Sequence, residues 1–439
     1  MERAAISCGL DFDGGCLYIM CFVLRKLSKP LLLGEKMNSE EQFALMQRIS
    51  ESFSPSAPID QKVLFAGRIQ QFTDVANAVA QRGQHVILFG ERGVGKTSLS
   101  TVISHAFKGT ANTISSGTIN CDQTMDFGGL WRKVFREIPI NAGITNGIGF
   151  NATPTMHTGS LADYLPATVT PDDIRHILQR LGKTIIVIDE LDRIEDPEVT
   201  TLLADTIKTL SDHSVPTTLI LVGVADSVNS LIQEHQSVER ALVQIRMPRM
   251  TVAELDEIID KGVANAGMTI EKAAKNKISS LSQGLPHYTH LLALHALQTA
   301  ARKGQTHVTG EDVSSAIENA LSKAQQSIIS AYHKATSSQR ENLYAQVLLA
   351  CALAKPDALG YFSAADVRDP MTEIMGRFYD IPAFSQHLNA FCDDQRGPIL
   401  QRIGETRRFR FRFINPLMQP YVTMDGLKRG LIKDTSLLK

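Results

Sequence analysis

Between residues 63 and 250, five short runs of apolar and β-branched residues alternate with stretches of helical periodicity. The runs cover residues 85–90, 116–121, 184–190, 217–226 and 242–248. They are apolar almost throughout, which is typical of strands that are buried on both faces. The pattern therefore predicts an α/β domain in which helices cover a parallel sheet.

After residue 250 the strand pattern gives way to helical patterns. Thr251 is followed three residues later by Glu254, a capping box that favours the start of a helix. Three further helical patterns follow, each ended or capped by Gly, Pro or Thr. We expect a small all-helical unit over residues 251–325.

A third module is expected over residues 336–428. Three helical patterns precede two alternating runs on either side of Gly404 and Glu405, which indicate a β-hairpin. Three helices followed by a hairpin predict a winged-helix domain. The acidic segment 391–397 is expected to belong to the candidate recognition helix.

Two segments stand outside these units. Residues 1–62 are expected to hold a leader and then an N-terminal helix; the leader is either disordered or precedes the true start at Met37, and is not expected to be an anchor. Residues 139–170 are rich in Gly, Asn and Thr and are expected to form a long, mobile insertion on the α/β domain.

The composition narrows the class of protein. The 439-residue chain has a formal net charge of −1, so only a local patch could attract a nucleic acid. No run reaches the roughly 18 to 20 apolar residues of a membrane span, and basic residues follow the short apolar run 16–24 instead of preceding it, unlike a secretory signal. The cysteines form no Cys-x-x-Cys pair, which suits free thiols in a cytoplasmic protein. They are Cys8, Cys16, Cys21, Cys121, Cys351 and Cys392.

The segment 85–100, HVILFGERGVGKTSLS, carries the most specific motif of the chain. It spells Gly-x-x-x-x-Gly-Lys-Thr between a predicted strand and a predicted helix. Glycines let such a loop aim its backbone N–H groups at phosphates, the Lys reaches the β and γ phosphates, and the hydroxyl binds Mg²⁺. The N-terminus of the helix also favours an anion. The predicted nucleotide-binding residues of the loop are Gly90, Gly93, Val94, Gly95, Lys96, Thr97 and Ser98.

Asp189 and Glu190 end the predicted strand 184–190. Asp189 is expected to hold the Mg²⁺ shell together with Thr97. A Glu beside the metal ligand can orient or activate an attacking water, so Glu190 predicts ATP hydrolysis and not binding alone. The alternative is a strand that happens to end in two acids, and the phosphate-binding loop upstream makes that alternative weak.

These motifs, in this order, resemble an AAA+ ATPase, in particular the branch of archaeal and eukaryotic origin-recognition initiators. They are also similar to the signalling STAND ATPases. The resemblance extends over residues 63–325 and more loosely over 336–425. It implies a P-loop NTPase domain with a helical lid, in which Lys96 and Glu190 serve catalysis.

The resemblance also implies contacts to the base and to the γ-phosphate. Gly67 and Arg68 stand where the family places a Gly-Arg segment against the adenine, although an ordinary turn before a helix is the alternative. Asp226 stands where the family carries a polar sensor residue, commonly Asn, and Asn229 could take that role instead.

The lid carries a mixture of the two family patterns. Pro286 matches a Gly-x-Pro element of STAND proteins that packs near the adenine. His287 takes the place of an Arg that initiators carry in their second sensor region. His is neutral for much of the time near pH 7, so a contact to the γ-phosphate is less secure here.

Arg240, just before the run 242–248, resembles the family's arginine finger, which reaches the γ-phosphate of a neighbouring subunit. A finger that acts in trans implies a homo-oligomer. The alternative is a surface arginine paired with Glu239. Arg246 and Arg249 are further candidates.

Arg408, Arg410 and Arg412 share one face of the second hairpin strand, and phenylalanines share the other. Arginines along a strand can contact a phosphate backbone, so duplex DNA is a candidate partner. The alternative is the solvated face of an amphipathic strand.

Two classes of function follow. The first is an ATP-hydrolysing AAA+ switch whose nucleotide state controls engagement of DNA or a partner protein. The second is a STAND-like signalling or scaffold ATPase with low turnover, which acts through a partner effector and binds no DNA.

Overall fold

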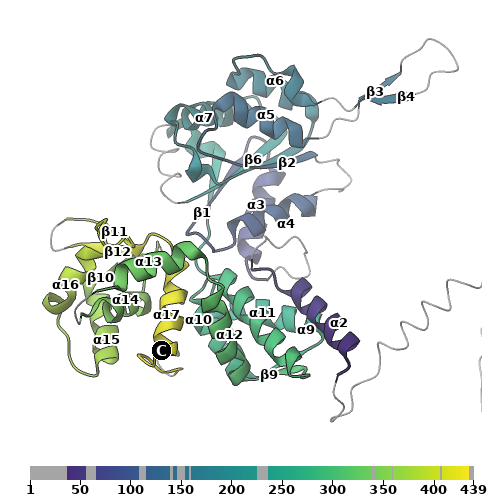
Figure 1. The fold of residues 1–439 in the computed structure, drawn as a ribbon. Coiled ribbons are helices and arrows are strands. Elements are labelled where there is room, and N and C mark those ends of the chain that lie inside the picture. Colours follow the sequence, from purple (N-terminus) through teal and green to yellow (C-terminus); the bar gives the residue numbers. More distant parts are fainter. Residues whose placement is uncertain are drawn as a thin grey trace, which may run out of the picture.

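The computed structural model describes residues 37–55, 66–107, 115–138, 142–145, 154–157, 160–224, 236–338, 342–357, 359–405 and 408–434. Figure 1 shows an α/β unit, here called the nucleotide domain, above a lower layer of helices. The helical lid and the winged-helix domain lie side by side in that layer. Within the described residues, no helix is both long and apolar enough to cross a membrane.

The sheet of the nucleotide domain is parallel throughout and has the order β2-β5-β6-β1-β7. The predicted strands are therefore confirmed, although the fourth ends at residue 223 and not 226. The bounds are β1 His85–Phe89, β2 Ser115–Asn120, β5 Thr184–Asp189, β6 Thr217–Gly223 and β7 Leu242–Arg246. Because the strands are parallel, all their carboxyl ends meet at one edge, where the predicted site residues follow β1 and β5.

Helices cover both faces of this sheet, as continuous apolar strands require. On β1, Val86 and Leu88 belong to a core shared with one pair of helices, whereas Ile87 belongs to the core on the other face. The first face is covered by α3 Ile69–Ala80 and α4 Lys96–Phe107. The second is covered by α5 Phe127–Glu137, α6 Pro171–Leu181 and α7 Pro197–Asp212.

The predicted insertion 139–170 contains secondary structure of its own. Strands β3 Ala142–Thr145 and β4 Pro154–His157 pair antiparallel, and a 3₁₀ turn, η1, covers Leu161–Tyr164. The pair lies away from the sheet (Figure 1). Mobility of the insertion stays a prediction.

The lid is helical, as predicted, apart from one short pair of strands. It consists of α9 Val252–Ala266, α10 Lys272–Ser282, α11 Pro286–Arg302 and α12 Gly310–Ser322, with a short parallel pair, β8 Thr269–Ile270 and β9 His307–Val308. The capping box is present, because the Thr251 side chain accepts a hydrogen bond from the Glu254 N–H.

The predicted N-terminal helix is present as α2 Ser39–Ser52, and it packs on α9 and α11 of the lid. The leader 1–36 lies outside the described residues. The domain boundaries stay predictions, although the elements change type at residue 250 as expected.

The C-terminal module is a winged-helix domain, as predicted, with three helices and a three-stranded sheet of order β10-β12-β11. The helices are α14 Tyr344–Leu353, α15 Ala364–Met375 and α16 Ile381–Ala390. The strands are β10 Phe362–Ser363, β11 Leu400–Ile403 and β12 Arg410–Phe413. Two flanking helices, α13 Gln326–Thr336 and α17 Met418–Lys428, were not anticipated.

One expectation for this domain is wrong. The acidic segment 391–397 is not part of the candidate recognition helix, because α16 ends at Ala390. Asp393 and Asp394 lie in the turns that follow, where the Asp393 N–H donates to the carbonyl of Ala390 and the Arg396 N–H donates to the carbonyl of Asp393. Turn-forming residues end the helix there.

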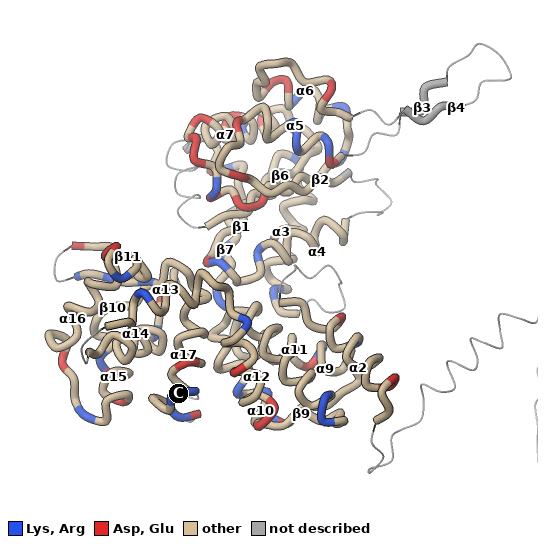
Figure 2. The backbone as a smooth tube through the Cα atoms, in the orientation of Figure 1, with Lys and Arg blue, Asp and Glu red and all other residues tan. Residues whose placement is uncertain are grey.

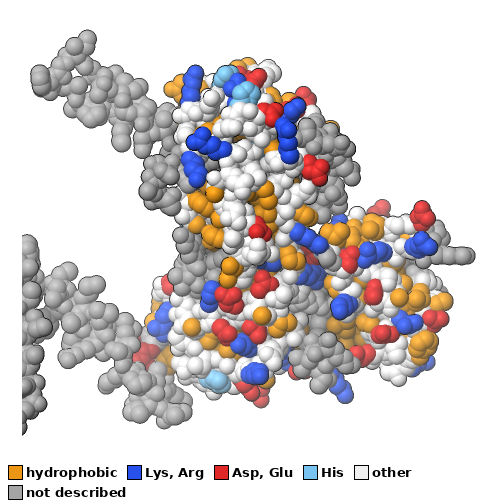
Figure 3. All heavy atoms as spheres, turned by 180° about the vertical axis from the view of Figure 1, so that it is seen from behind, with side chains coloured by type: hydrophobic (Ala, Val, Ile, Leu, Met, Phe, Trp, Pro, Cys, Tyr) orange, Lys and Arg blue, Asp and Glu red, His pale blue; other side chains and the backbone are white. Residues whose placement is uncertain are grey.

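The lid, α2 and the winged-helix domain share one continuous hydrophobic core. That core runs from Leu45 on α2 through Leu292 on α11 to Val422 on α17. The nucleotide domain has separate cores on the two faces of its sheet. Seen from behind, it forms an upper lobe, and exposed apolar side chains are scattered over the surface in small groups (Figure 3).

Candidate nucleotide-binding site

The loop between β1 and α4 forms the floor of a cleft of about 720 Å³. Gly93 and Gly95 have φ values of +82° and +93°, which only glycine adopts without strain, and this lets the loop wrap tightly. Lys96 Nζ donates to the carbonyl oxygens of Gly90 and Glu91, at 2.9 and 2.8 Å. Burial lowers the pKa of Lys96 to about 8, although nearby Asp192 and Asp189 oppose the shift.

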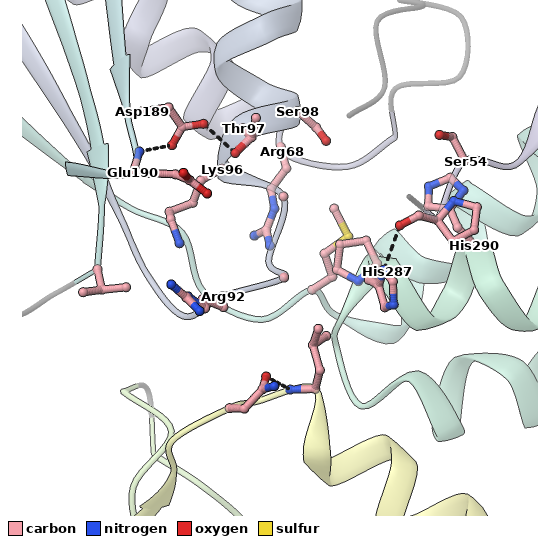
Figure 4. Close-up of a pocket in the computed structure, with 18 of the residues that line it drawn as sticks. Ser54, Arg68, Arg92, Lys96, Thr97, Ser98, Asp189, Glu190, His287 and His290 are labelled. Carbon is pink, nitrogen blue, oxygen red and sulfur yellow. Dashed lines mark hydrogen bonds between the residues drawn. The ribbon is translucent and has the colours of Figure 1, made fainter. Parts of the chain in front are cut away.

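Asp189 lies against the loop, as the sequence predicts. Its Oδ2 accepts a hydrogen bond from the Thr97 hydroxyl at 2.6 Å, and its Oδ1 accepts one from the Glu190 N–H at 2.7 Å (Figure 4). Burial raises the pKa of Asp189, which Thr97 and the backbone partly offset. A hydroxyl and a carboxylate held this close are the oxygen ligands that Mg²⁺ takes beside nucleotide phosphates, so the residues present fit that ion.

Glu190 lines the same cleft beside Asp189. It has a left-handed backbone (φ +58°) at the turn from β5 into the 3₁₀ turn Leu191–Arg193. Its carboxylate pairs with Arg193 at 3.0 Å. Asp192 pairs with Arg92 of the loop at 3.7 Å, so two arginines not anticipated from the sequence stand at the phosphate end. Both pairs are partly exposed, which leaves them weak enough to exchange partners.

Arg68 joins three segments behind the loop. Its guanidinium is buried and donates to the carbonyls of Val94 at 3.1 Å and Pro248 at 2.5 Å. Its backbone N–H donates to Glu254 of the lid. Burial lowers the pKa of Arg68, and Glu254 opposes this shift. The predicted Gly-Arg segment therefore fixes the loop and the lid relative to each other.

The opposite end of the cleft holds Ser54, His287 and His290 (Figure 4). Pro55, Ala66, Met250, Ile258 and Pro286 also line the cleft, and Pro286 lies near Gly95 of the loop. His287 Nδ1 bonds the Pro55 carbonyl at 2.8 Å, and burial lowers the His287 pKa. In Figure 4 His287 lies well away from Lys96 and Asp189, so it belongs to this end and not to the γ-phosphate end.

The winged-helix domain reaches into the cleft, which the sequence did not predict. Asn415 and Leu417, just before α17, line it together with the loop. A Cβ placed on Gly93 would lie 3.1 Å from Leu417 Cδ2, so the leucine packs directly on the phosphate-binding loop. The carbonyl of Leu417 also accepts a hydrogen bond from the Tyr288 hydroxyl of the lid, at 2.7 Å.

Arg249 forms a junction of all three units. Its Nε pairs with Glu91 of the loop at 2.7 Å, its Nη1 donates to the Gln283 carbonyl of the lid, and its Nη2 donates to Gln419 of α17. Both charged side chains are largely buried, at 18% and 15% exposure. Loss of one partner of such a pair typically costs about 3–5 kcal/mol. These contacts occupy Arg249 within its own chain, unlike a finger that acts in trans.

The remaining predicted site residues have mixed outcomes. Ser98 lines the cleft, whereas Gly67, Gly90 and Val94 are outside its lining, and Gly90 lines a second cavity, between the wing and the nucleotide domain. Gly67 N–H donates to Glu257 of the lid at 2.9 Å. Asp226, with its alternative Asn229, lies outside the described residues.

Arg240 lies just before β7, as predicted, and is 77% exposed. It does not pair with Glu239. Its partner is Asp212 at the end of α7, at 3.0 Å. It lies outside the described lining of its own cleft.

Two of the three predicted arginines of the wing have partners, whereas Arg408 precedes β12 and is exposed. Arg410 pairs with Asp357 at 2.7 Å, and Arg412 bonds Gln401 at 2.8 Å and lines the second cavity. The phenylalanine face is buried at Phe411 and Phe413, as predicted. Basic and acidic positions are interspersed over the winged-helix elements (Figure 2).

This loop, its acidic partner strand and the strand order of the sheet define a P-loop NTPase, here joined to a helical lid and a winged helix. The family model described as Novel STAND NTPase 1 matches residues 57–360, and the chain belongs to this family. The resemblance to STAND ATPases predicted from the sequence is therefore confirmed. No curated protein matches the chain.

The chain is also similar to several solved structures. The Aeropyrum pernix ORC2 protein, in ADPNP–ADP complexes, is 13% identical with a TM-score of 0.49, over 89% of this chain and 98% of the other. Cdc6p from Pyrobaculum aerophilum is 15% identical with a TM-score of 0.43, over 87% and 98%. The Walker-type ATPase paby2304 of Pyrococcus abyssi is 15% identical with a TM-score of 0.47, over 84% and 98%. These similarities are too low to carry an argument about what this chain binds.

Proposed function

We propose that the chain is an ATP-hydrolysing switch in which the bound nucleotide sets whether the winged-helix domain is seated on the phosphate-binding loop. The observation that carries this proposal is the contact of Leu417 with Gly93. A side chain of the output domain touches the loop that must hold the phosphates. Any rearrangement of that loop therefore acts on the seat of the winged helix.

The geometry supports a role for each residue at the phosphate end. Lys96 exchanges its two carbonyl partners for phosphate oxygens, and the glycine backbone supplies further N–H donors. Thr97 and Asp189 would hold Mg²⁺, which would neutralise phosphate charge. Glu190 orients or deprotonates the attacking water after its carboxylate leaves Arg193.

The seated arrangement favours low turnover, in line with a signalling STAND ATPase. Asn415 and Leu417 close one side of the cleft, and the junction at Arg249 ties the loop to the lid and to α17. Nucleotide exchange then requires these contacts to open. We assign the switch to a protein partner or effector, which binds the surface released when the winged helix leaves the loop.

Duplex DNA is the less favoured partner. Arg410 is paired with Asp357 and Arg412 lines the cavity against the nucleotide domain, so two of the three predicted arginines are engaged within the chain in the seated state. A homo-oligomer fits Arg240, whose exposed side chain could reach the cleft of a neighbouring subunit. The free thiols of Cys121, Cys351 and Cys392 fit a cytoplasmic location.

The test is the rate of nucleotide exchange in Leu417→Glu. A carboxylate in place of the leucine would lie against the phosphate-binding loop and repel the bound phosphates. The winged-helix domain would then no longer pack on that loop. We expect release of a fluorescent ADP to accelerate at least roughly tenfold. Lys428→Glu places the same side chain at the exposed far end of α17 and serves as the control.

Equal release rates in the wild type and in both variants would contradict the proposal. Steady-state ATP turnover measured with and without duplex DNA separates the partners. DNA could stimulate turnover of the wild type but not of the triple variant Arg408→Ala, Arg410→Ala, Arg412→Ala. That result would show that the partner is DNA and not a protein.

A further inference from the structure

His290 is a buried histidine of the lid whose ring nitrogens have no partner. It lies on α11, one turn after His287, and only 5% of its surface is exposed. Neither Nδ1 nor Nε2 makes a hydrogen bond within the described part of the chain. Buried polar groups are almost always paired, so two unpaired atoms on one ring call for a ligand or a water.

The position of His290 points to a ligand. Its ring lines the nucleotide cleft at the end formed by Ser54, Pro55 and His287. Figure 4 shows it beside Ser54, on the side of the cleft away from Lys96 and Asp189. With the phosphates held at Lys96, a bound nucleotide would place its base at this end.

The ring is fixed in place from behind. Phe53 meets it edge-on, with ring centroids 5.9 Å apart and planes at 67°. Gly262 on α9 leaves the space that Phe53 fills, since a Cβ there would collide with the phenyl ring. The segment that carries Ser54 and Pro55 is thereby held against the lid, and His290 cannot readily turn away from the cleft.

The charge state of the two histidines suits a neutral base. Burial lowers the pKa of His290 to about 4. His287 donates from Nδ1 to the Pro55 carbonyl, which leaves its Nε2 as an acceptor. The base end therefore offers neutral imidazoles, one of which has both a donor and an acceptor free.

We propose that His290 is the specificity residue of the cleft and hydrogen-bonds an edge of the adenine base through its otherwise unpaired ring nitrogens. Adenine presents an amino donor at N6 beside ring acceptors at N1 and N7, so either tautomer of the imidazole finds a partner. Apolar contacts from Met250, Ile258 and Pro286 hold the base but do not distinguish one base from another. This inference rests on the proposed function, which places ATP in the cleft.

The test combines a side-chain deletion with a base deletion. We would measure dissociation constants of wild type and His290→Phe for ATP, for 7-deaza-ATP and for purine riboside triphosphate, which lacks the N6 amino group. The wild type should bind one of the two analogues roughly tenfold more weakly than ATP. His290→Phe should bind ATP and that analogue equally, because phenylalanine lacks the imidazole nitrogens that hydrogen-bond the base.

His295→Phe is the matched control. His295 lies on the same helix with the same 5% exposure, but it is outside the described cleft lining and bonds Gln298. It should keep the wild-type preference. His290→Gln, which restores a donor and an acceptor, should recover part of the preference and guards against a folding defect of the phenylalanine variant.

The outcomes separate the two proposals. If the wild type binds none of the three triphosphates, the proposed function fails and this inference falls with it. If the wild type binds ATP but shows no preference, or if His290→Phe keeps the preference, only the role of His290 is overturned.

Discussion

At the scale of single residues, Lys96 is the group on which nucleotide binding depends most. It is the cation of the phosphate-binding loop, and its ammonium is held by two carbonyls that phosphate oxygens can replace. Burial has already lowered its pKa to about 8, so its charge is sensitive to pH in a range where ATP itself is fully ionised.

We expect Lys96→Ala to lose at least roughly 100-fold in ATP affinity, about 2.7 kcal/mol. Lys133→Ala removes a half-exposed lysine that bonds the Asn120 carbonyl, and should bind ATP normally. If calorimetry finds the same ATP affinity in Lys96→Ala as in the wild type, this loop is not the nucleotide-binding site.

A pH series tests the same residue. Phosphates bind the charged lysine, so affinity should be full below pH 8 and fall as the pH rises above it, by up to about tenfold per unit. Lys96→Arg should bind more weakly but show no such fall, because arginine stays charged. A decline that persists in Lys96→Arg would come from another group.

At the scale of elements, the strands and the loop were predictable because their signals are local. Continuous apolar runs mark strands buried on both faces, and the glycines and Lys96 stand next to one another along the chain. The turn after α16 was misread because Asp393 and Asp394 follow the helical pattern without a break, and only the turn bonds that end α16 show where the helix stops.

Contacts between distant elements left no such signal. Leu417 contacts Gly93, although more than 300 residues separate them in the sequence. Arg249 donates a hydrogen bond to Gln419, and nothing in the sequence distinguishes Gln419 from other polar side chains as its partner. His290 is one of twelve histidines in the sequence, and only the fold places it in the cleft. The Gly-Arg segment was found by resemblance, but its buried bonds to Val94 and Pro248 were not.

Strand β1 carries a prediction about acid stability. His85 is buried, its Nδ1 accepts a hydrogen bond from the Leu219 N–H at 3.1 Å, and burial lowers its pKa to about 4. In the unfolded chain His85 binds a proton near pH 6.5, whereas in the folded chain it stays neutral at that pH. Stability should therefore be complete above pH 6.5 and be lost as the pH falls from 6.5 towards 4.

Thermal melts between pH 7.5 and 4.5 measure this loss. His85→Asn keeps an acceptor for Leu219 and cannot take a proton, so its melting temperature should fall less steeply with acid. His290 has a similarly lowered pKa, so part of the slope should remain. Identical slopes for wild type and His85→Asn would show that His85 does not govern acid unfolding.

At the scale of the whole molecule, the division of the cores suggests what moves. The lid, α2 and the winged-helix domain share one hydrophobic core, whereas the nucleotide domain has a core on each face of its sheet, one of which takes in Leu285 of the lid. The polar contacts between these parts include the junction at Arg249 and the bonds of Arg68 and Gly67 to the lid, and Leu417 packs on the loop. We therefore expect motion to occur across this junction and not within the lower layer.

The most direct test is a distance between the two parts, measured by pulsed electron paramagnetic resonance. Spin labels at Asp205 on α7 and Asp369 on α15 would occupy exposed positions outside the cleft. The account predicts one distance with ADP and a different one with a non-hydrolysable ATP analogue, and no response to either nucleotide in Lys96→Ala. Identical distances with both nucleotides, at concentrations that saturate the site, would contradict a switch controlled by the nucleotide.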